Sequence, residues 1–151
     1  MTRLQMPFRR GARMHTRGQA LVEVALILPV FILVLVGIFD LGRAVYAFNT
    51  LSNSAREAAR VGIVNQSTAV VSGHAIQHAV ALGLDAGDVE LAFLTPDLSA
   101  TCSAPVALGC VVEVTVHYEF VPATPILSNL IGSLDLSSTA REPVERTYQS
   151  P

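Results

Sequence analysis

The clearest pattern along the chain is an apolar run at residues 20–39, ALVEVALILPVFILVLVGIF, with one charge, Glu23, and one proline, Pro29. Twenty helical residues span about 30 Å, which is the hydrocarbon thickness of a bilayer. A helix that is apolar on all sides needs either lipid or a large core around it, and the rest of the chain is too short to supply that core. The pattern therefore predicts a transmembrane helix at about residues 20–39.

Beyond Asp40 the apolar residues recur in three- and four-residue steps, which is typical of one face of an α-helix. This apolar stripe consists of Leu41, Ala44, Val45, Phe48, Leu51, Ala55, Ala58, Ala59 and Gly62. We therefore expect one helix over residues 19–64, about 70 Å long at 1.5 Å per residue. Its first half would lie in lipid and its second half on a small domain.

The rest of the chain, residues 65–151, predicts a small mixed domain. A shorter helix is expected at residues 74–82, with Ser72 as its cap and Gly83 just past its end. Period-two alternation then predicts strands at residues 89–93, 110–120 and 134–141, with a helical turn at residues 125–131. The expected fold class is α+β: a long N-terminal helix, a short second helix and a three-stranded antiparallel sheet that packs one face on the long helix.

Charge is distributed asymmetrically about the apolar run. All ten basic residues are arginines, and five precede the run, where no acid occurs: Arg3, Arg9, Arg10, Arg13 and Arg17. Short basic flanks stay in the cytoplasm, so residues 1–18 are expected to be a cytoplasmic leader and residues 65–151 an extracytoplasmic domain. The later chain holds all twelve acids, which excludes a nucleic-acid surface, because such surfaces need clustered basic residues.

Residues with catalytic or metal-binding chemistry are few. Cys102 and Cys110 would lie in an oxidising compartment, so a disulfide between them is expected. His74 and His78 are four positions apart, but the glutamate of an HExxH metal site is missing between them. The outer domain also lacks a nucleophile elbow and a phosphate-binding loop. We therefore expect no metal, no cofactor and no enzymatic activity.

The start of the apolar run carries a more specific signal. A glutamate at the bilayer centre costs about 2.5–3.5 kcal/mol and less near an interface, so Glu23 should either have a partner or snorkel to the headgroups. A glycine followed five positions later by a glutamate, Gly18 and Glu23, resembles the class III signal of type IV pilins. The resemblance implies that a prepilin peptidase cuts after Gly18, that Gln19 becomes the N-terminus, and that Glu23 acts in assembly.

Over residues 17–64 the chain is similar to TadE-like proteins, the minor pseudopilins of tight-adherence (Flp) pilus systems. The matching landmarks are Arg17-Gly18-Gln19, Glu23, Leu28-Pro29, Asp40-Leu41-Gly42-Arg43 and Ala55-Arg56-Glu57-Ala58-Ala59-Arg60. Val24 stands where a Flp major pilin usually has an aromatic residue, which favours a minor subunit. The resemblance implies a pilin-like domain, roles in secretion or cell adhesion, and partners among pilins, pseudopilins and the Tad assembly platform.

Six further residues are candidates for interfaces. Asp40 and Arg43 lie three positions apart where the helix leaves the membrane, and an interfacial anchor is the default expectation for them. Pro29 either serves helix packing or is tolerated in lipid. Arg56, Glu57 and Arg60 form either a solvated helix surface or a partner contact.

The leading hypothesis is a non-enzymatic minor pseudopilin of a Tad/Flp-type system, processed after Gly18 and held in the membrane lipid by one helix. The alternative is an uncleaved, signal-anchored membrane protein whose outer domain binds a partner or a surface ligand. A membrane-tethered enzyme is a third interpretation, and it is disfavoured because the outer domain has few candidate catalytic or metal-binding residues.

Overall fold

The computed structural model describes residues 16–103 and 105–147. The predicted basic leader lies outside the described residues except for its last three positions. Contacts divide the chain into two units, Met1–Ile38 and Phe39–Pro151. The first helix, α1 (Thr16–Gly62), contributes residues to both units, and its bounds lie within three residues of the predicted ones.

In the first unit, α1 exposes apolar side chains all round. Every residue from 18 to 35 is exposed, and Pro29 lies inside the helix without ending it. Among the described residues, α1 is the one helix long and apolar enough to cross a membrane, with a mean hydropathy of 2.9 over an 18-residue window. This helix fits a single-pass membrane protein.

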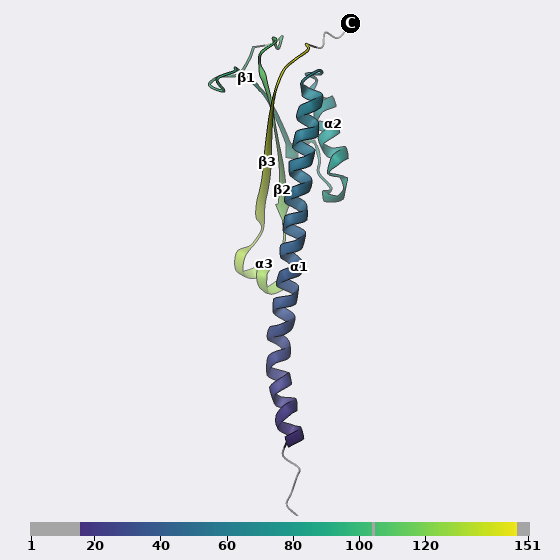
Figure 1. Ribbon diagram of the computed structural model, residues 1–151, viewed down its shortest axis with the longest axis vertical. Helices are drawn as coiled ribbons and strands as arrows, with labels where there is room; N and C mark the ends of the chain where they lie inside the picture. Colours follow the sequence, from purple (N-terminus) through teal and green to yellow (C-terminus); the bar gives the residue numbers. More distant parts are fainter. Residues whose placement is uncertain (1–15, 104, 148–151) are drawn as a thin grey trace, which may run out of the picture. The chain divides into compact units, whose positions relative to one another are not determined.

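The second unit is built on an antiparallel sheet with helices over one face (Figure 1). Its strands follow one another in chain order across the sheet: β1 (Val89–Leu94), β2 (Val111–Phe120) and β3 (Leu134–Pro143). The other described elements are α2 (Thr68–His78), the 3₁₀ turns η1 (Val80–Leu82) and η2 (Ala86–Asp88), and α3 (Pro125–Ile131). The predicted α+β fold class is confirmed.

The central strand β2 shows why the sheet has one dry face. Val112, Val114 and Val116 are 0% exposed and pack against the helices, as their alternation predicts. The opposite face carries polar cross-strand pairs. Arg141 on β3 pairs with Glu113, and the hydroxyls of Thr115 and Thr139 lie 2.9 Å apart. Such pairs stabilise neighbouring strands without burying charge.

Small side chains allow the second half of α1 to lie close to its neighbours. Ala55, Ala58 and Ala59 are fully buried in a core shared with α2 and β2. The Ser54 hydroxyl donates a hydrogen bond to the carbonyl of Ala75 in α2 at 2.7 Å, so this buried polar group is satisfied.

The prediction of the second helix is wrong in its bounds and its cap. Helix α2 begins at Thr68 rather than at residue 74, because its buried positions Val71 and Ala75 continue the four-residue spacing further upstream. Ser72 is therefore a buried residue inside the helix, and Ser67 occupies the N-cap. The end of the helix also differs from the prediction, because α2 ends at His78 and not at residue 82. Gly83 follows the 3₁₀ turn η1 instead, with a φ of 70°, a conformation that suits glycine.

The apolar stripe of α1 is also wrong in its first half. Leu41, Val45 and Phe48 are 65%, 53% and 49% exposed, whereas Ala47 and Leu51 are buried. The face that packs on the sheet is the one with small residues, because alanine permits a closer approach of backbone to backbone. Leu41, Val45 and Phe48 consequently face outward from the second unit.

Candidate functional site

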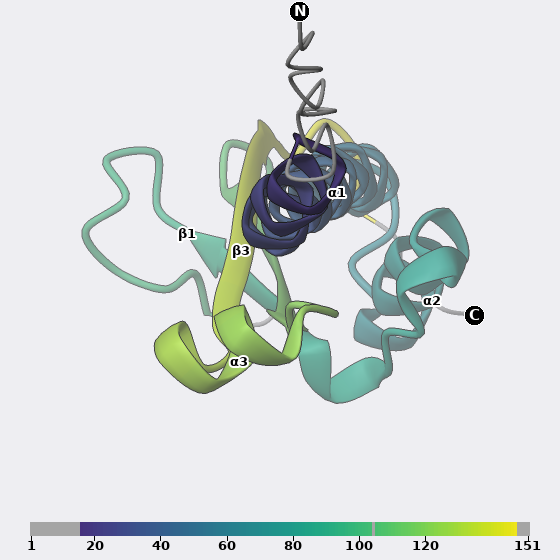
Figure 2. The same ribbon diagram turned by 90° about the horizontal axis from the view of Figure 1, so that it is seen from below.

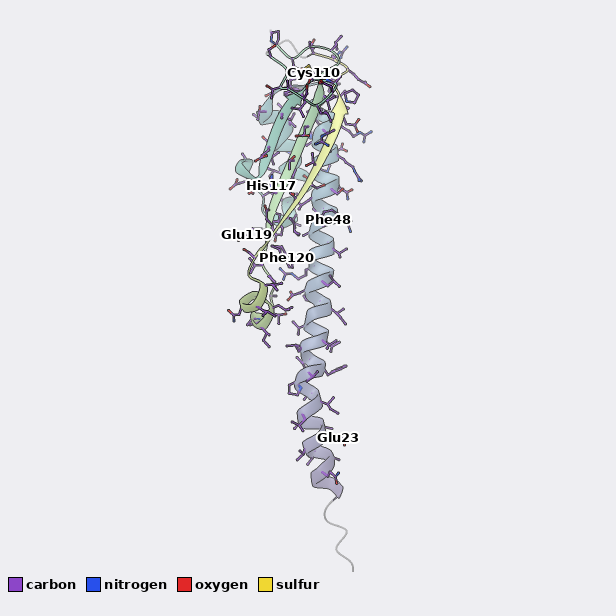
Figure 3. All side chains as sticks on the ribbon, turned by 90° about the vertical axis from the view of Figure 1, so that its left-hand side faces the viewer. Glu23, Phe48, Cys110, His117, Glu119 and Phe120 are labelled. Atoms are coloured by element: carbon purple, nitrogen blue, oxygen red, sulfur yellow. A yellow bond between two sulfur atoms is a disulfide. The ribbon has the colours of Figure 1, made fainter. Side chains whose placement is uncertain are left out.

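Gly18, Gln19 and Glu23 all lie in the first turns of α1 and are exposed. Figure 3 shows Glu23 on the lower turns of the helix, where its neighbours in sequence are apolar. Gln19 and Glu23 are four positions apart, so they share one face of the helix. Among the side chains that the structure describes, none pairs with Glu23. A carboxylate in an apolar surface without a partner is costly in lipid.

Asp40 is held by residues far away in the chain. Its carboxylate accepts hydrogen bonds from the Thr124 hydroxyl at 2.5 Å, from the Thr124 amide at 3.0 Å and from the Ala123 amide at 3.0 Å. Arg43 adds an ion pair at 3.2 Å. The pKa of Asp40 is lowered from 3.8 to about 2, and the hydrogen bond from the Thr124 hydroxyl is the strongest cause. The two backbone amides and Arg43 lower the pKa further, whereas burial of the carboxylate raises it.

Arg43 connects the same place to the end of β2. Its guanidinium lies 5.4 Å from the centre of the Phe120 ring, within cation–π distance. The structure thus brings Asp40 and Arg43 together in a tether between α1 and the segment that follows β2. An interface role with another protein stays a prediction for both residues.

Thr124 was not singled out from the sequence, although it carried a recognisable signal. It stands directly before Pro125 at the first position of α3. A threonine before a proline is typical of a helix start. The sequence could not show that its hydroxyl faces Asp40 rather than its own helix, because the two residues are 84 positions apart.

Arg56, Glu57 and Arg60 lie on the second half of α1. Arg60 pairs with Glu57 at 3.5 Å and both side chains are well exposed, so this pair contributes little to stability. The three residues line an open groove of about 510 Å³ together with His78 of α2 and Glu142 of β3. The groove has mixed charge, and a partner contact there stays a prediction.

Cys102 and Cys110 are joined by a disulfide, with their Cα atoms 6.5 Å apart. The bridge closes the loop between β1 and β2, and Cys110 belongs to the core. In the same loop, hydrogen bonds from Ser99 and then from Thr95 lower the pKa of Asp97 to about 2. In the part of the chain that the structure describes, no group of three or more side chains could hold a metal ion.

The exposed apolar helix and the small α+β unit fit the class of single-pass membrane proteins with one folded domain. Within this class, a family model described as TadE-like protein matches residues 18–60 of the chain. The resemblance inferred from the sequence is thereby confirmed over this segment, and it indicates a role related to the Tad pilus with pilus-related partners. No curated protein and no solved structure shows significant similarity to the chain.

Proposed function

We propose that this protein is a non-enzymatic minor pseudopilin of a Tad/Flp-type pilus assembly or secretion system, and that it is processed after Gly18. The observation that carries the proposal is the exposed position of Glu23 on the apolar part of α1, five residues after Gly18. Glu23 is the one charged residue between residues 18 and 39, and it lies inside the TadE-like segment.

Cleavage after Gly18 would remove all five leader arginines and create an α-amine on Gln19. At low dielectric an amine and a carboxylate attract each other strongly, and neither is favourable alone in lipid. Gln19 lies four residues before Glu23, about 6 Å along the helix axis. A neighbouring subunit displaced by that one turn would bring its amine to the depth of Glu23. The pair would therefore set the axial register between subunits.

The outward face of α1 supports assembly beyond the membrane segment. Leu41, Val45 and Phe48 are spaced by four and three residues, so they form one apolar strip on the helix. A strip of this spacing is suited to contact with another helix. In this proposal the strip packs against the helices of neighbouring pilins or pseudopilins, while the sheet unit faces away from them.

The orientation in the proposal follows from charge and redox chemistry. The leader holds five arginines and no acid, so it remains in the cytoplasm by the positive-inside rule. The domain that carries the Cys102–Cys110 disulfide then lies outside, where disulfides persist. The partners in this proposal, a prepilin peptidase and the Tad assembly platform, follow from the similarity to TadE-like proteins over residues 18–60.

The processing step is tested by determining the N-terminus of the chain in membranes that contain the matching prepilin peptidase. Intact mass and N-terminal sequencing should find a chain that begins at Gln19. Recovery of the full-length chain alone, beginning at its start methionine, would overturn the proposal. That result would favour the signal-anchored alternative, in which the outer domain binds its ligand directly.

A matched pair of glycine variants excludes misfolding as the cause of lost cleavage. A Cβ added at Gly18 or at Gly37 would meet no atom within 4 Å, so the backbone at both positions has room for a side chain. Gly18→Leu should accumulate uncleaved in the membrane, and Gly37→Leu should be cleaved as the wild type is. Equal cleavage of the two variants would show that the cut lies elsewhere.

A further inference from the structure

Helix α3 is a short element with an unusual surface. Ile126, Leu130 and Ile131 are 59%, 78% and 49% exposed, although all three are large apolar residues. Val121 before the helix and Leu134 after it are also exposed. No charged residue occurs between residues 120 and 134. Seen from below in Figure 2, α3 lies at the edge of the second unit, with no other labelled element on its outer side.

The position of α3 along the chain is set by two sets of contacts within the second unit. Phe120 of β2 pairs with Leu134 of β3, so residues 121–133 all lie beyond this end of the sheet. Thr124, the N-cap of α3, is bound to Asp40. Asp40 is the first residue after the apolar run of residues 20–39. The start of α3 is therefore fixed at the point where α1 leaves its apolar segment.

We propose that α3 is an interfacial membrane element, whose Ile126, Leu130 and Ile131 enter the boundary between the lipid headgroups and the acyl chains. Apolar side chains on a short helix beside a membrane exit bury their surface in this layer. The uncharged segment lacks the lysines and arginines that attract anionic lipid. The contact is therefore made with the apolar part of any phospholipid bilayer and does not depend on headgroup charge.

This inference rests on the membrane segment proposed for α1 and not on cleavage or pilus assembly. The sequence contains no tryptophan, so a single introduced tryptophan reports on one position. Leu130→Trp places the probe on α3, and Ile126→Trp is a second probe on the same helix. Leu108→Trp is the matched control, because Leu108 is 66% exposed but lies in the disulfide loop at the opposite end of β2.

The full-length chain is reconstituted into phosphatidylcholine vesicles, and separately into vesicles containing phosphatidylglycerol. The lipids of both leaflets carry bromine near the upper end of the acyl chain. Tryptophan on α3 should emit at shorter wavelength than tryptophan at residue 108, and the brominated lipid should quench it to the same extent in both vesicle types. The emission of Leu108→Trp should be unaffected by bromine.

Three results would overturn the inference. If the α3 probes behave as the Leu108→Trp control does, α3 is in water. If their emission is shifted but bromine does not quench it, another protein surface, such as a second copy of the chain, covers α3 instead of lipid. If the chain does not float with the vesicles, α1 does not insert and the proposed function fails as well. Flotation without quenching leaves the proposed function standing and removes only the role of α3.

Discussion

Asp40 and Thr124, 84 positions apart in the chain, are joined by two hydrogen bonds to one carboxylate oxygen. The Thr124 amide donates at 3.0 Å and its hydroxyl at 2.5 Å. Asp40 is 4% exposed, although an aspartate at the end of a membrane segment would ordinarily face the headgroups and water. Asp40 is therefore held by a contact within the chain, which links α1 to the start of α3.

Replacing Asp40 by asparagine should loosen this connection. Asparagine has one acceptor oxygen in place of two, so the three donors from Ala123 and Thr124 can no longer all be satisfied. We expect faster amide hydrogen exchange in residues 121–133 and little change in β2. Mass-spectrometric exchange on the full chain in detergent measures both regions. Thr124→Val should also raise the exchange rate in residues 121–133. Unchanged exchange in both variants would contradict a stabilising role for the Asp40–Thr124 contact.

The tether should also respond to acid. The pKa of Asp40 is lowered from 3.8 to about 2 in the folded state. A depressed folded-state pKa means that the stabilisation is complete above pH 3.8 and is lost as the pH falls towards about 2. The midpoint temperature of thermal unfolding, followed by circular dichroism, should therefore fall more steeply on acidification in the wild type than in Asp40→Asn. Because Asp97 has a similarly lowered pKa, both chains should also carry Asp97→Asn.

Gly62 should not accept even a methyl group. A Cβ added there would lie 2.7 Å from Cγ2 of Val112, a fully buried side chain in β2. We expect Gly62→Ala to destabilise the second unit by about 1–3 kcal/mol through overpacking. Gly73 in α2 is the control, because a Cβ there meets nothing within 4 Å. Gly73→Ala should be neutral or should stabilise by about 0.5–1 kcal/mol, and denaturant unfolding compares the two.

The Cys102–Cys110 disulfide should form in the native protein and stabilise its loop. Alkylation without reductant should leave both thiols unlabelled, and the Cys102→Ser/Cys110→Ser double variant should lose about 2.5 kcal/mol by the loop-closure estimate. Ready labelling of both cysteines in the untreated protein would contradict the bridge and would weaken the assignment of the domain to the outside.

Features of the fold were predictable from the sequence where they depend on residues close together in the chain, and not where they depend on packing between distant segments. Strand β2 was predictable because Val112, Val114 and Val116 alternate with polar residues, and burial follows that alternation directly. The buried face of α1 was predictable from Leu51 onward but not before it, since Phe48 and Ala47 are neighbours and hydrophobicity alone favours burying the phenylalanine. In the structure the smaller residue, Ala47, is buried because it allows close packing, and Phe48 is exposed.

In the candidate site, too, only the residues that are close together in the chain were predictable. Gly18 and Glu23 are recognisable because their spacing along one helix is the signal itself. The role of Asp40 depends on Thr124, which only the fold brings next to it. Asp40 and Arg43 were expected to form an interfacial anchor, and the structure shows that they pair with each other. The sequence held no information on the Phe120 ring beside Arg43.

The most direct test of the account compares Glu23→Ala with the wild type for both membrane insertion and assembly. The change makes the helix more apolar, so the variant should insert and be cleaved normally. It should nevertheless lose crosslinks to the pilus components, because a neighbour's amine would be left unpaired in lipid. Glu23→Gln should be intermediate, and Glu119→Ala, an exposed glutamate on β2, should behave as the wild type does. Normal crosslinking and pilus output in Glu23→Ala would contradict the account.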